Sequence, residues 1–399
     1  MSHAELQRRW YNLQTKVAED GLDALLVSAR ESIYYLTGVV CEPLERPLFL
    51  LVRRDGPPAL LVPALERDHI RSAANVGHVE VYREHPAPAG QGWGDKLHQM
   101  LNGATEIGIE PSLRVEIADE LSAVSPRTKP LVEELRVVKS PAEIEMIRRA
   151  ACYADLGVQR LLASSYYGSS VAEGFIETQT VTKRIIRESQ DFNPLLSKVV
   201  MGTWAAPRSA QPHSIPKLHD RLWGGPHIAL VLTTVDGYSA ECERTYFTSR
   251  PAREVRQAFD AMMEARQIAF DMVRPGVACA EVDAAANEFL GKEGYGDKLL
   301  HRTGHGLGIA YHAEAPWLAE GSHEVLAAGM VLSIEPGVYF PGIGGVRHSD
   351  TVLVTGSGGE FLTRCPTDLE QLTITGWKPL ARIKGALLGR SLRLSRTRG

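Results

Sequence analysis

The first third of the chain alternates short apolar runs with segments of helical periodicity. Between about Glu5 and Leu135 these runs are DALLVSA, PLFLLVR, PALLVPA, HVEVYR, EIGIEP and PLVEEL. Apolar runs of this length, separated by helical patterns, are typical of strands in an α/β domain. We therefore predict an N-terminal α/β domain, built around a mixed sheet, over residues 1–136.

The remainder of the chain has longer helical patterns, followed or interrupted by strands rich in Val, Ile and Gly. Ser140 is a suitable N-cap, Pro141 takes the first helical position, and Glu143 completes a capping box. The predicted helices span about 142–164, 170–189, 252–273 and 279–293. This order predicts an α+β domain over residues 137–375, with helices on one face of an antiparallel sheet.

One hairpin is marked by its turn residues. Asp236-Gly237 is typical of a two-residue turn and predicts pairing of strands at roughly 228–234 and 239–246. The second strand carries Glu241 and Glu243, which lie on one face because side chains alternate along a strand.

Composition narrows the class of protein. The chain has 399 residues, of which 44% are hydrophobic and 23% are charged, and this indicates a globular protein of two domains. It has no run of about 18 apolar residues that would predict a membrane span. Five cysteines without a CxxC pair argue against a disulfide framework or a zinc ribbon. We expect a cytoplasmic protein.

The last segment, residues 376–399, holds seven Lys or Arg and no acid. Such a tail is compatible with binding nucleic acid or anionic lipid, but a frayed end is the better explanation. We predict a basic tail that can be disordered, assign it no function, and expect neither a nucleic acid nor a membrane partner.

Several acids and histidines occur in apolar, strand-like surroundings. Glu335 lies within GMVLSIEPGV, where an acid must be paired, protonated or bound to a metal. His305 has a glycine on each side, which lets other groups approach its ring. The remaining candidates are His213, His312, Glu241 and Glu243. Each of them alone is also compatible with a structural role.

Together these motifs resemble the "pita-bread" family of creatinase, prolidase, aminopeptidase P and methionine aminopeptidase. The motifs are PHSIP, DGYSAECERTYF, GHGLGIAYH, GMVLSIEPGVY and GGVR. The resemblance implies a small N-terminal α/β domain, a C-terminal pita-bread domain and a homodimer.

The metallopeptidases of this family hold two divalent ions with two aspartates, one histidine and two glutamates. In this sequence those positions fall on Leu230, Glu241, His305, Glu335 and Ser349. Leucine offers no lone pair and serine is a poor neutral ligand, so a dinuclear centre is not expected. A single ion at Glu241, His305 and Glu335 is the weaker alternative to a site without a cofactor.

This sequence differs from the metallopeptidases in a manner that resembles creatinase, the member of the family that works without metal. Its active-site glutamates correspond to Glu243 and Glu335, and its catalytic histidine corresponds to His213. Arg46 corresponds to an arginine that holds the substrate carboxylate in the neighbouring subunit's site. At three other active-site positions of creatinase this sequence has different residues. Those positions fall on Ser239, near Pro316 and on Ser349.

The resemblance therefore predicts a metal-independent, creatinase-like hydrolase that cleaves a C–N bond of a small amidine, guanidino or zwitterionic compound. His213 is the expected base and then acid, and Glu243 and Glu335 are expected to bind and polarise the substrate. His305 completes the catalytic set. The expected substrate-binding residues are Arg46, Glu241, Tyr311, His312 and Arg347.

Two other interpretations stay open. The first is an Xaa-Pro aminopeptidase or prolidase-like metallohydrolase, which would depend on a divalent ion. The second is a non-catalytic binding protein on the same fold, although such proteins usually lose the pocket histidines and acids.

Overall fold

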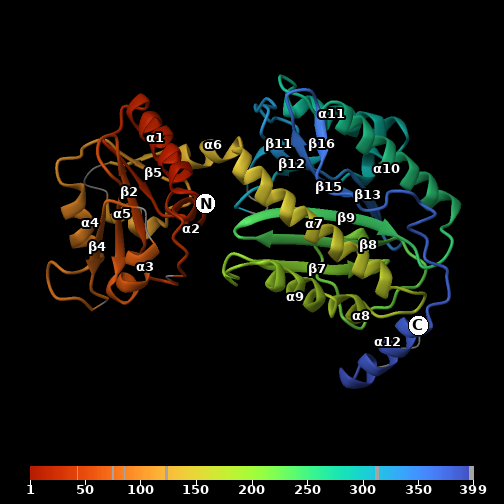
Figure 1. The fold of residues 1–399 in the computed structure, drawn as a ribbon. Helices are drawn as coiled ribbons and strands as arrows, with labels where there is room; N and C mark the ends of the chain where they lie inside the picture. Colours follow the sequence, from red (N-terminus) through yellow and green to blue (C-terminus); the bar gives the residue numbers. More distant parts are fainter. Residues whose placement is uncertain (43, 74–75, 85, 122–124, 311–313, 395–399) are drawn as a thin grey trace. The chain divides into compact units, whose positions relative to one another are not determined.

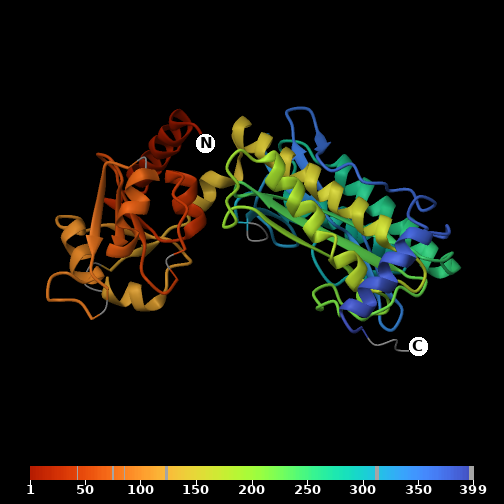
Figure 2. The same cartoon turned by 60° about the horizontal axis from the view of Figure 1, so that its bottom comes forward.

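The computed structural model describes residues 1–42, 44–73, 76–84, 86–121, 125–310 and 314–394. The chain divides into two compact units, Met1–Arg136 (unit 1) and Val137–Gly399 (unit 2). Figures 1 and 2 show each unit as a sheet with helices packed on it.

Unit 1 is an α/β unit around one mixed sheet with strand order β4-β3-β2-β1-β5-β6. Strand β1 pairs antiparallel with β2 and parallel with β5. Its elements are α1 (His3–Glu19), β1 (Ala24–Val27), α2 (Arg30–Thr37), β2 (Phe49–Arg53), β3 (Ala59–Pro63), η1 (Ala64–Glu66), α3 (Arg67–Ala73), β4 (His78–Tyr82), α4 (Trp93–Leu101), β5 (Ile107–Ile109), α5 (Val115–Glu120), β6 (Arg127–Thr128) and α6 (Leu131–Val137).

The apolar runs of the sequence account for most of this sheet. All four residues of β1 are buried, as expected of a strand whose faces are both covered. The run PLVEEL is the exception, because residues 131–137 form helix α6 rather than a strand. Its length alone did not distinguish a short buried helix from a strand.

Unit 2 is built on a larger sheet with strand order β11-β10-β12-β15-β9-β8-β7 and a separate hairpin β13-β14. Its strands are β7 (Lys198–Trp204), β8 (His227–Val235), β9 (Tyr238–Tyr246), β10 (Gly304–Gly306), β11 (Glu314–Leu318), β12 (Val331–Ile334), β13 (Gly337–Phe340), β14 (Gly344–Arg347), β15 (Ser349–Val354) and β16 (Gly359–Phe361). Its helices are α7 (Pro141–Ser164), α8 (Val171–Phe175), α9 (Thr178–Glu188), η3 (Arg208–Ala210), α10 (Arg253–Asp271), α11 (Cys279–Lys292), η4 (Gly296–Lys298) and α12 (Pro379–Ser391).

Helix α7 begins where the capping residues predict. The Ser140 side chain accepts from the Glu143 amide, and the Glu143 carboxylate accepts from the Ser140 amide. This reciprocal pair satisfies two amides that have no partner within the helix. Figure 1 shows α7 running across β8 and β9.

The β8–β9 hairpin sets the register of the central strands. Its turn residues Asp236 and Gly237 both have positive φ, 49° and 86°, as a type I′ turn requires. Val235 is paired with Tyr238 next to the turn, and Leu230 is paired with Glu243 further along. Every residue of β9 is buried, so this strand forms the centre of the unit.

Part of the basic tail is helical. Residues 379–391 form α12, so the expectation of disorder is wrong for this part of the tail. The Lys378 ammonium donates to the Leu162 carbonyl oxygen at the end of α7 (2.8 Å). Helix α12 lies beside α8 in Figure 1, and a Cβ at Gly385 of α12 would meet the Glu173 side chain of α8. Within the described ranges, every helix is too short or too polar to cross a bilayer.

A buried ion cluster joins β9, β15 and α10. The Arg244 guanidinium donates to both carboxylate oxygens of Asp350 (2.7 and 3.2 Å), and Arg266 donates to the same carboxylate (2.8 Å). Burial acts to raise the pKa of Asp350, but the two guanidinium groups outweigh it and hold that pKa below its ordinary value. Asp350 therefore stays ionised and neutralises part of the charge of both arginines.

We expect Asp350→Asn to lower the stability of unit 2 by about 3–5 kcal/mol, because it leaves two buried guanidinium groups without a carboxylate. Thermal and urea unfolding, followed by circular dichroism, measure this change. Asp260→Asn is the matched control, since Asp260 forms an exposed pair with Arg256. The control should change stability by no more than about 0.5 kcal/mol.

The contribution of Asp350 to the stability of the protein depends on pH. A carboxylate with a depressed folded pKa stabilises the protein above its unfolded pKa of about 3.9 and loses this effect as pH falls through the folded value. The stability difference between wild type and Asp350→Asn should therefore be largest near neutral pH and shrink below about pH 4. A difference that is constant from pH 7 to pH 3 would contradict this account.

Candidate active site and metal centre

The neighbouring strands β15, β9 and β8 form one part of the site. Glu241 and Glu243 lie two residues apart on β9 and project from the same face. Ser349 on β15 is paired with Glu243, and its hydroxyl donates to a Glu241 carboxylate oxygen (2.6 Å). On the other side of β9, Leu230 of β8 is paired with Glu243.

Two glycines bring His305 to the same place. A Cβ at Gly304 would clash with the Ser333 carbonyl of β12, and a Cβ at Gly306 would clash with the Ala315 carbonyl of β11. Only glycine lets β10 approach both neighbouring strands so closely. The His305 amide donates to the Ser333 hydroxyl (3.0 Å), and Glu335 follows directly after β12.

The three groups converge on one point. His305 Nε2 lies 3.3 Å from a Glu335 carboxylate oxygen and 3.7 Å from a Glu241 carboxylate oxygen. His305 Nδ1 lies 2.9 Å from the Gly306 carbonyl oxygen, which can only accept, so Nδ1 carries the proton. This tautomer directs the Nε2 lone pair at two carboxyl groups, an arrangement that requires a proton or a cation among them.

A second chain of polar contacts begins at Glu243. Its carboxylate forms a bidentate ion pair with Arg347, whose other nitrogen donates to the Tyr339 hydroxyl oxygen (3.2 Å). The same hydroxyl lies 2.7 Å from His301 Nε2. Arg347 is thereby fixed by both partners, and Glu243 has a matching positive charge.

Burial changes the titration of these groups. It raises the pKa of Glu243 to about 7, with Arg347 opposing the rise and Glu241 adding to it. It raises the pKa of Glu335 well above its ordinary value, and the nearby Glu241 charge adds to this. Burial lowers the pKa of His301 to about 4, so this imidazole is neutral near pH 7. The pocket therefore favours an added positive charge beside Glu241 and Glu335.

The three acids and Arg347 line a cavity of about 310 Å³. Its lining combines polar and apolar side chains: Val200, Trp204, Pro212, His213, Leu230, Val231, Leu232, Glu241, Glu243, Glu335 and Arg347. His213 is exposed and lies in the segment after η3, whereas the acids of the pocket are buried. A cavity of this size accommodates a small ligand that is no larger than a few amino-acid residues.

The structure brings together six of the residues predicted from sequence. They are His213, Glu241, Glu243, His305, Glu335 and Arg347. Arg46 belongs to unit 1, where it pairs with Glu84 (2.6 Å) and Glu45 (3.1 Å). Tyr311 and His312 lie outside the described residues.

Sequence reasoning missed Tyr339, His301 and Ser333. Tyr339 lies in the same motif as Glu335, and its strand β13 pairs with β14, which carries Arg347. Its place in the motif was therefore a usable sign that it lies near the site. Ser333 precedes Glu335 by two residues and shares its strand alternation. His301 occurs in a loop without a local pattern, and only the fold places it against Tyr339.

The fold and site define a two-domain chain of the creatinase and prolidase type. Residues 145–356 match the model of metallopeptidase family M24, and residues 9–138 match the creatinase/prolidase N-terminal domain. The chain belongs to metallopeptidase family M24. The predicted fold, an α/β domain followed by a pita-bread domain, is confirmed.

Several of the proteins to which this chain is similar are named as dipeptidases. The chain is 27% identical to an Xaa-Pro dipeptidase of Pyrococcus horikoshii, over 88% of this chain and 95% of that protein. It is 31% identical to the probable dipeptidase PepE of Mycobacterium tuberculosis, over 88% of this chain and 92% of that protein. The solved structure of dipeptidase PepE from Mycobacterium ulcerans has a TM-score of 0.81 at 29% identity, covering 94% of this chain and 100% of that one.

These findings correct the predicted chemistry. The expected metal-independent, creatinase-like amidine or guanidine hydrolase is wrong, because the relatives are named as dipeptidases of a metallopeptidase family. The expectation of no cofactor is wrong for the same reason. The broader expectation of a hydrolase acting on C–N bonds agrees with the relatives, since a peptide bond is such a bond.

The side chains present fit one divalent ion. Glu241, His305 and Glu335 each offer a ligand atom, and these atoms lie within 4.8 Å of one another. Two carboxylates and an imidazole suit Mn²⁺, Co²⁺ or Zn²⁺. The fit does not extend to a second ion, since Leu230 has no donor atom and the Ser349 hydroxyl donates to Glu241.

We expect Gly306→Ala to destabilise the protein by several kcal/mol, because its Cβ would overlap backbone atoms of Ala315 and Glu314 that cannot move aside. Gly291→Ala in α11 is the control, since a Cβ there meets no atom within 4 Å. Replacing that helical glycine should stabilise the protein by about 0.5–1 kcal/mol. Thermal unfolding measures both, and equal effects would contradict the packing account of β10.

Proposed function

We propose that this protein is a dipeptidase that hydrolyses the C–N bond of a small peptide with the help of one divalent metal ion held by Glu241, His305 and Glu335. The main supporting observation is the convergence of these three side chains, two of which, Glu241 and Glu335, line a cavity of about 310 Å³, in a chain of family M24. Xaa-Pro dipeptides are the first substrates to test, because relatives carry that name.

The cavity supports a substrate with one apolar end. Leu230, Leu232 and Trp204 line the same cavity, and the two leucines are the cross-strand partners of Glu243 and Glu241. A side chain or a pyrrolidine ring can bury apolar surface there, with a gain of roughly 25 cal/mol per Å². Arg347 and His213, which also line the cavity, suit the charged or hydrogen-bonding groups of a peptide.

The charges of the buried pocket support one ion rather than two. Arg347 balances Glu243 through their bidentate pair, which leaves Glu241 and Glu335. One dication balances these two carboxylates. A second dication would have no further acid to balance it, because Leu230 and Ser349 are neutral.

When bound, the ion would polarise the scissile carbonyl and acidify a water molecule. Glu241 and Glu335 hold their carboxylates toward this position, and Ser349 fixes one of them by its hydrogen bond. Arg347, fixed by Glu243 and Tyr339, presents a rigid cation beside the cavity. His213, an exposed residue of the cavity lining, passes a proton to the leaving nitrogen.

Arg46, Tyr311 and His312 stay in this proposal as substrate-binding residues. Arg46 would contact the substrate of the neighbouring subunit in a homodimer. Light scattering on the purified chain tests the dimer. Mixing Arg46→Ala subunits with His305→Ala subunits tests the shared site, because restored activity in the mixture requires complementation between subunits.

We expect the purified protein loaded with Mn²⁺ or Co²⁺ to hydrolyse dipeptides and to lose this activity on dialysis against a chelator. His305→Ala should lower kcat/KM by at least about 100- to 1,000-fold, because it removes a ligand of the ion that stabilises the developing charge. His323→Ala, an exposed histidine that does not line the cavity, should keep normal activity. Full turnover by metal-free protein would refute the proposal.

We expect about one Mn²⁺ to bind per chain, as measured by elemental analysis and calorimetry. Glu335→Gln should weaken this binding at least tenfold, because it replaces a charged ligand by a neutral one. Leu230→Asp combined with Ser349→Glu restores two carboxylates and should raise the stoichiometry toward two. Two tightly bound Mn²⁺ ions in the unmodified chain would contradict the one-ion site.

A further inference from the structure

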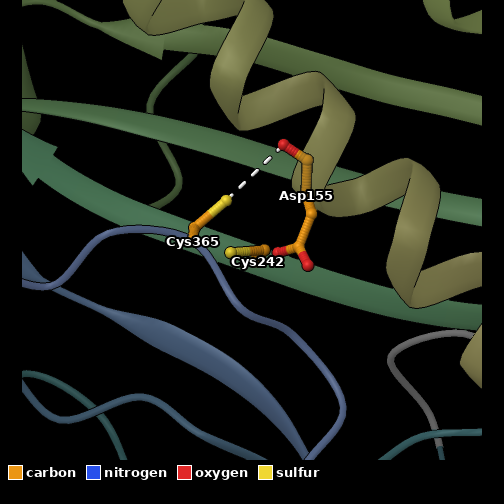
Figure 3. Close-up of side chains that lie close together, drawn as sticks. All are labelled: Asp155, Cys242 and Cys365. Carbon is orange, nitrogen blue, oxygen red and sulfur yellow. Dashed lines mark hydrogen bonds between the residues drawn. The ribbon is translucent and has the colours of Figure 1, made fainter.

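A second cluster of metal-binding side chains lies outside the candidate active site (Figure 3). Asp155 comes from α7, Cys242 from β9, and Cys365 from the segment after β16. Their ligand atoms all lie within 4.8 Å of one another. Cys242 is fully buried and Cys365 is 4% exposed, whereas Asp155 is only partly buried.

The cluster lies behind the strand that carries the two active-site acids. Cys242 stands between Glu241 and Glu243 in β9, so its side chain projects from the opposite face of the sheet. Helix α7, which carries Asp155, crosses this strand in Figure 1. The two sets of donors are therefore separated by the sheet itself.

Hydrogen bonds hold two of the three donors in place. The Asp155 carboxylate accepts from the Arg364 amide through both oxygens (2.8 and 3.0 Å), and the Cys365 thiol donates to the Asp155 carbonyl oxygen (3.5 Å). Each carboxylate oxygen keeps a lone pair for a further interaction. Such contacts orient ligands in the way that outer-shell groups of metal sites do.

The donor types favour a thiophilic ion. Two sulfur atoms and a carboxylate are ligands that Zn²⁺ and Cd²⁺ accept, whereas Mn²⁺ prefers oxygen and nitrogen. Three protein ligands leave a fourth position of a tetrahedral ion open.

The surrounding charge balances a loaded site. Two thiolates and one carboxylate around a divalent ion carry one net negative charge. The neighbouring cluster of Arg244, Arg266 and Asp350 carries one net positive charge, and the Arg244 charge acts on both Cys242 and Asp155. Because the two thiols lose two protons when the dication binds, the three side chains with Asp155 ionised carry one net negative charge before and after loading, and the neighbouring positive charge offsets it in both states.

We propose that Asp155, Cys242 and Cys365 form a second metal site that binds a thiophilic divalent ion such as Zn²⁺ behind β9. Each thiol releases its proton to solvent when the ion binds, so that the ion is held by two thiolates and a carboxylate. The ion would link α7, β9 and the segment after β16, and would thereby stabilise the strand that presents Glu241 and Glu243.

Titration of the full-length protein with Cd²⁺ tests this site, because thiolate-to-Cd²⁺ charge transfer absorbs in the ultraviolet. We expect the band to saturate at about one Cd²⁺ per chain. It should disappear in Cys242→Ser and in Cys365→Ser, and Asp155→Asn should weaken binding at least tenfold. Cys152→Ser, which removes an exposed thiol of α7, should leave the band unchanged.

X-ray absorption of the Cd²⁺-loaded wild type identifies the ligand atoms directly. This test uses no variant, so it does not depend on whether the cysteine variants fold. Two sulfur ligands support the site, and ligation by oxygen and nitrogen alone overturns it. A band that persists in Cys242→Ser, or no band at all, also overturns it. His305→Ala should keep the band, so failure of the proposed dipeptidase activity and failure of this site are distinguishable.

Discussion

The balance of charge in the buried pocket is the constraint on which the candidate active site depends. Glu241, Glu243 and Glu335 are each at most 7% exposed, and a buried carboxylate without a counter-charge costs several kcal/mol. Arg347 balances one of them through a bidentate pair. The other two face the His305 lone pair, so the fold provides a place for one added dication, in agreement with membership of a metallopeptidase family.

Strand β9 produces this arrangement through its alternation. Its front face presents Glu241 and Glu243 to the pocket, and its rear face presents Cys242 and Arg244 to α7, α10 and β15. On the front face Arg347 neutralises the charge of Glu243, and on the rear face Asp350 neutralises the charge of Arg244. Because one backbone carries both sets of contacts, a change in packing behind the strand alters the position of the acids in front.

Much of the fold and of the site could be predicted from sequence. The capping box at Ser140, the Asp236-Gly237 turn and the apolar runs of unit 1 each have a local physical cause, and the structure has the corresponding helix, hairpin and strands. The convergence of Glu241, His305 and Glu335 was accessible through the motifs. The contact of His301 with Tyr339 was not, because it depends on the packing of β13 against a distant segment. The helical nature of residues 131–137 was also missed, since a short buried run has no distinctive period.

The error in the predicted chemistry has a physical origin. Leu230 and Ser349 stand at two of the family's five ligand positions, and this difference was given more weight than the single-ion alternative at Glu241, His305 and Glu335. The structure shows that the two substitutions lie on either side of Glu243, whereas Glu241, His305 and Glu335 keep their ligand atoms within 4.8 Å of one another. Glu243 is paired with Arg347, so a fixed guanidinium supplies positive charge in the part of the pocket where donors for a second ion are missing. A site with one ion and one arginine can therefore retain metal-assisted hydrolysis after losing two of its ligands.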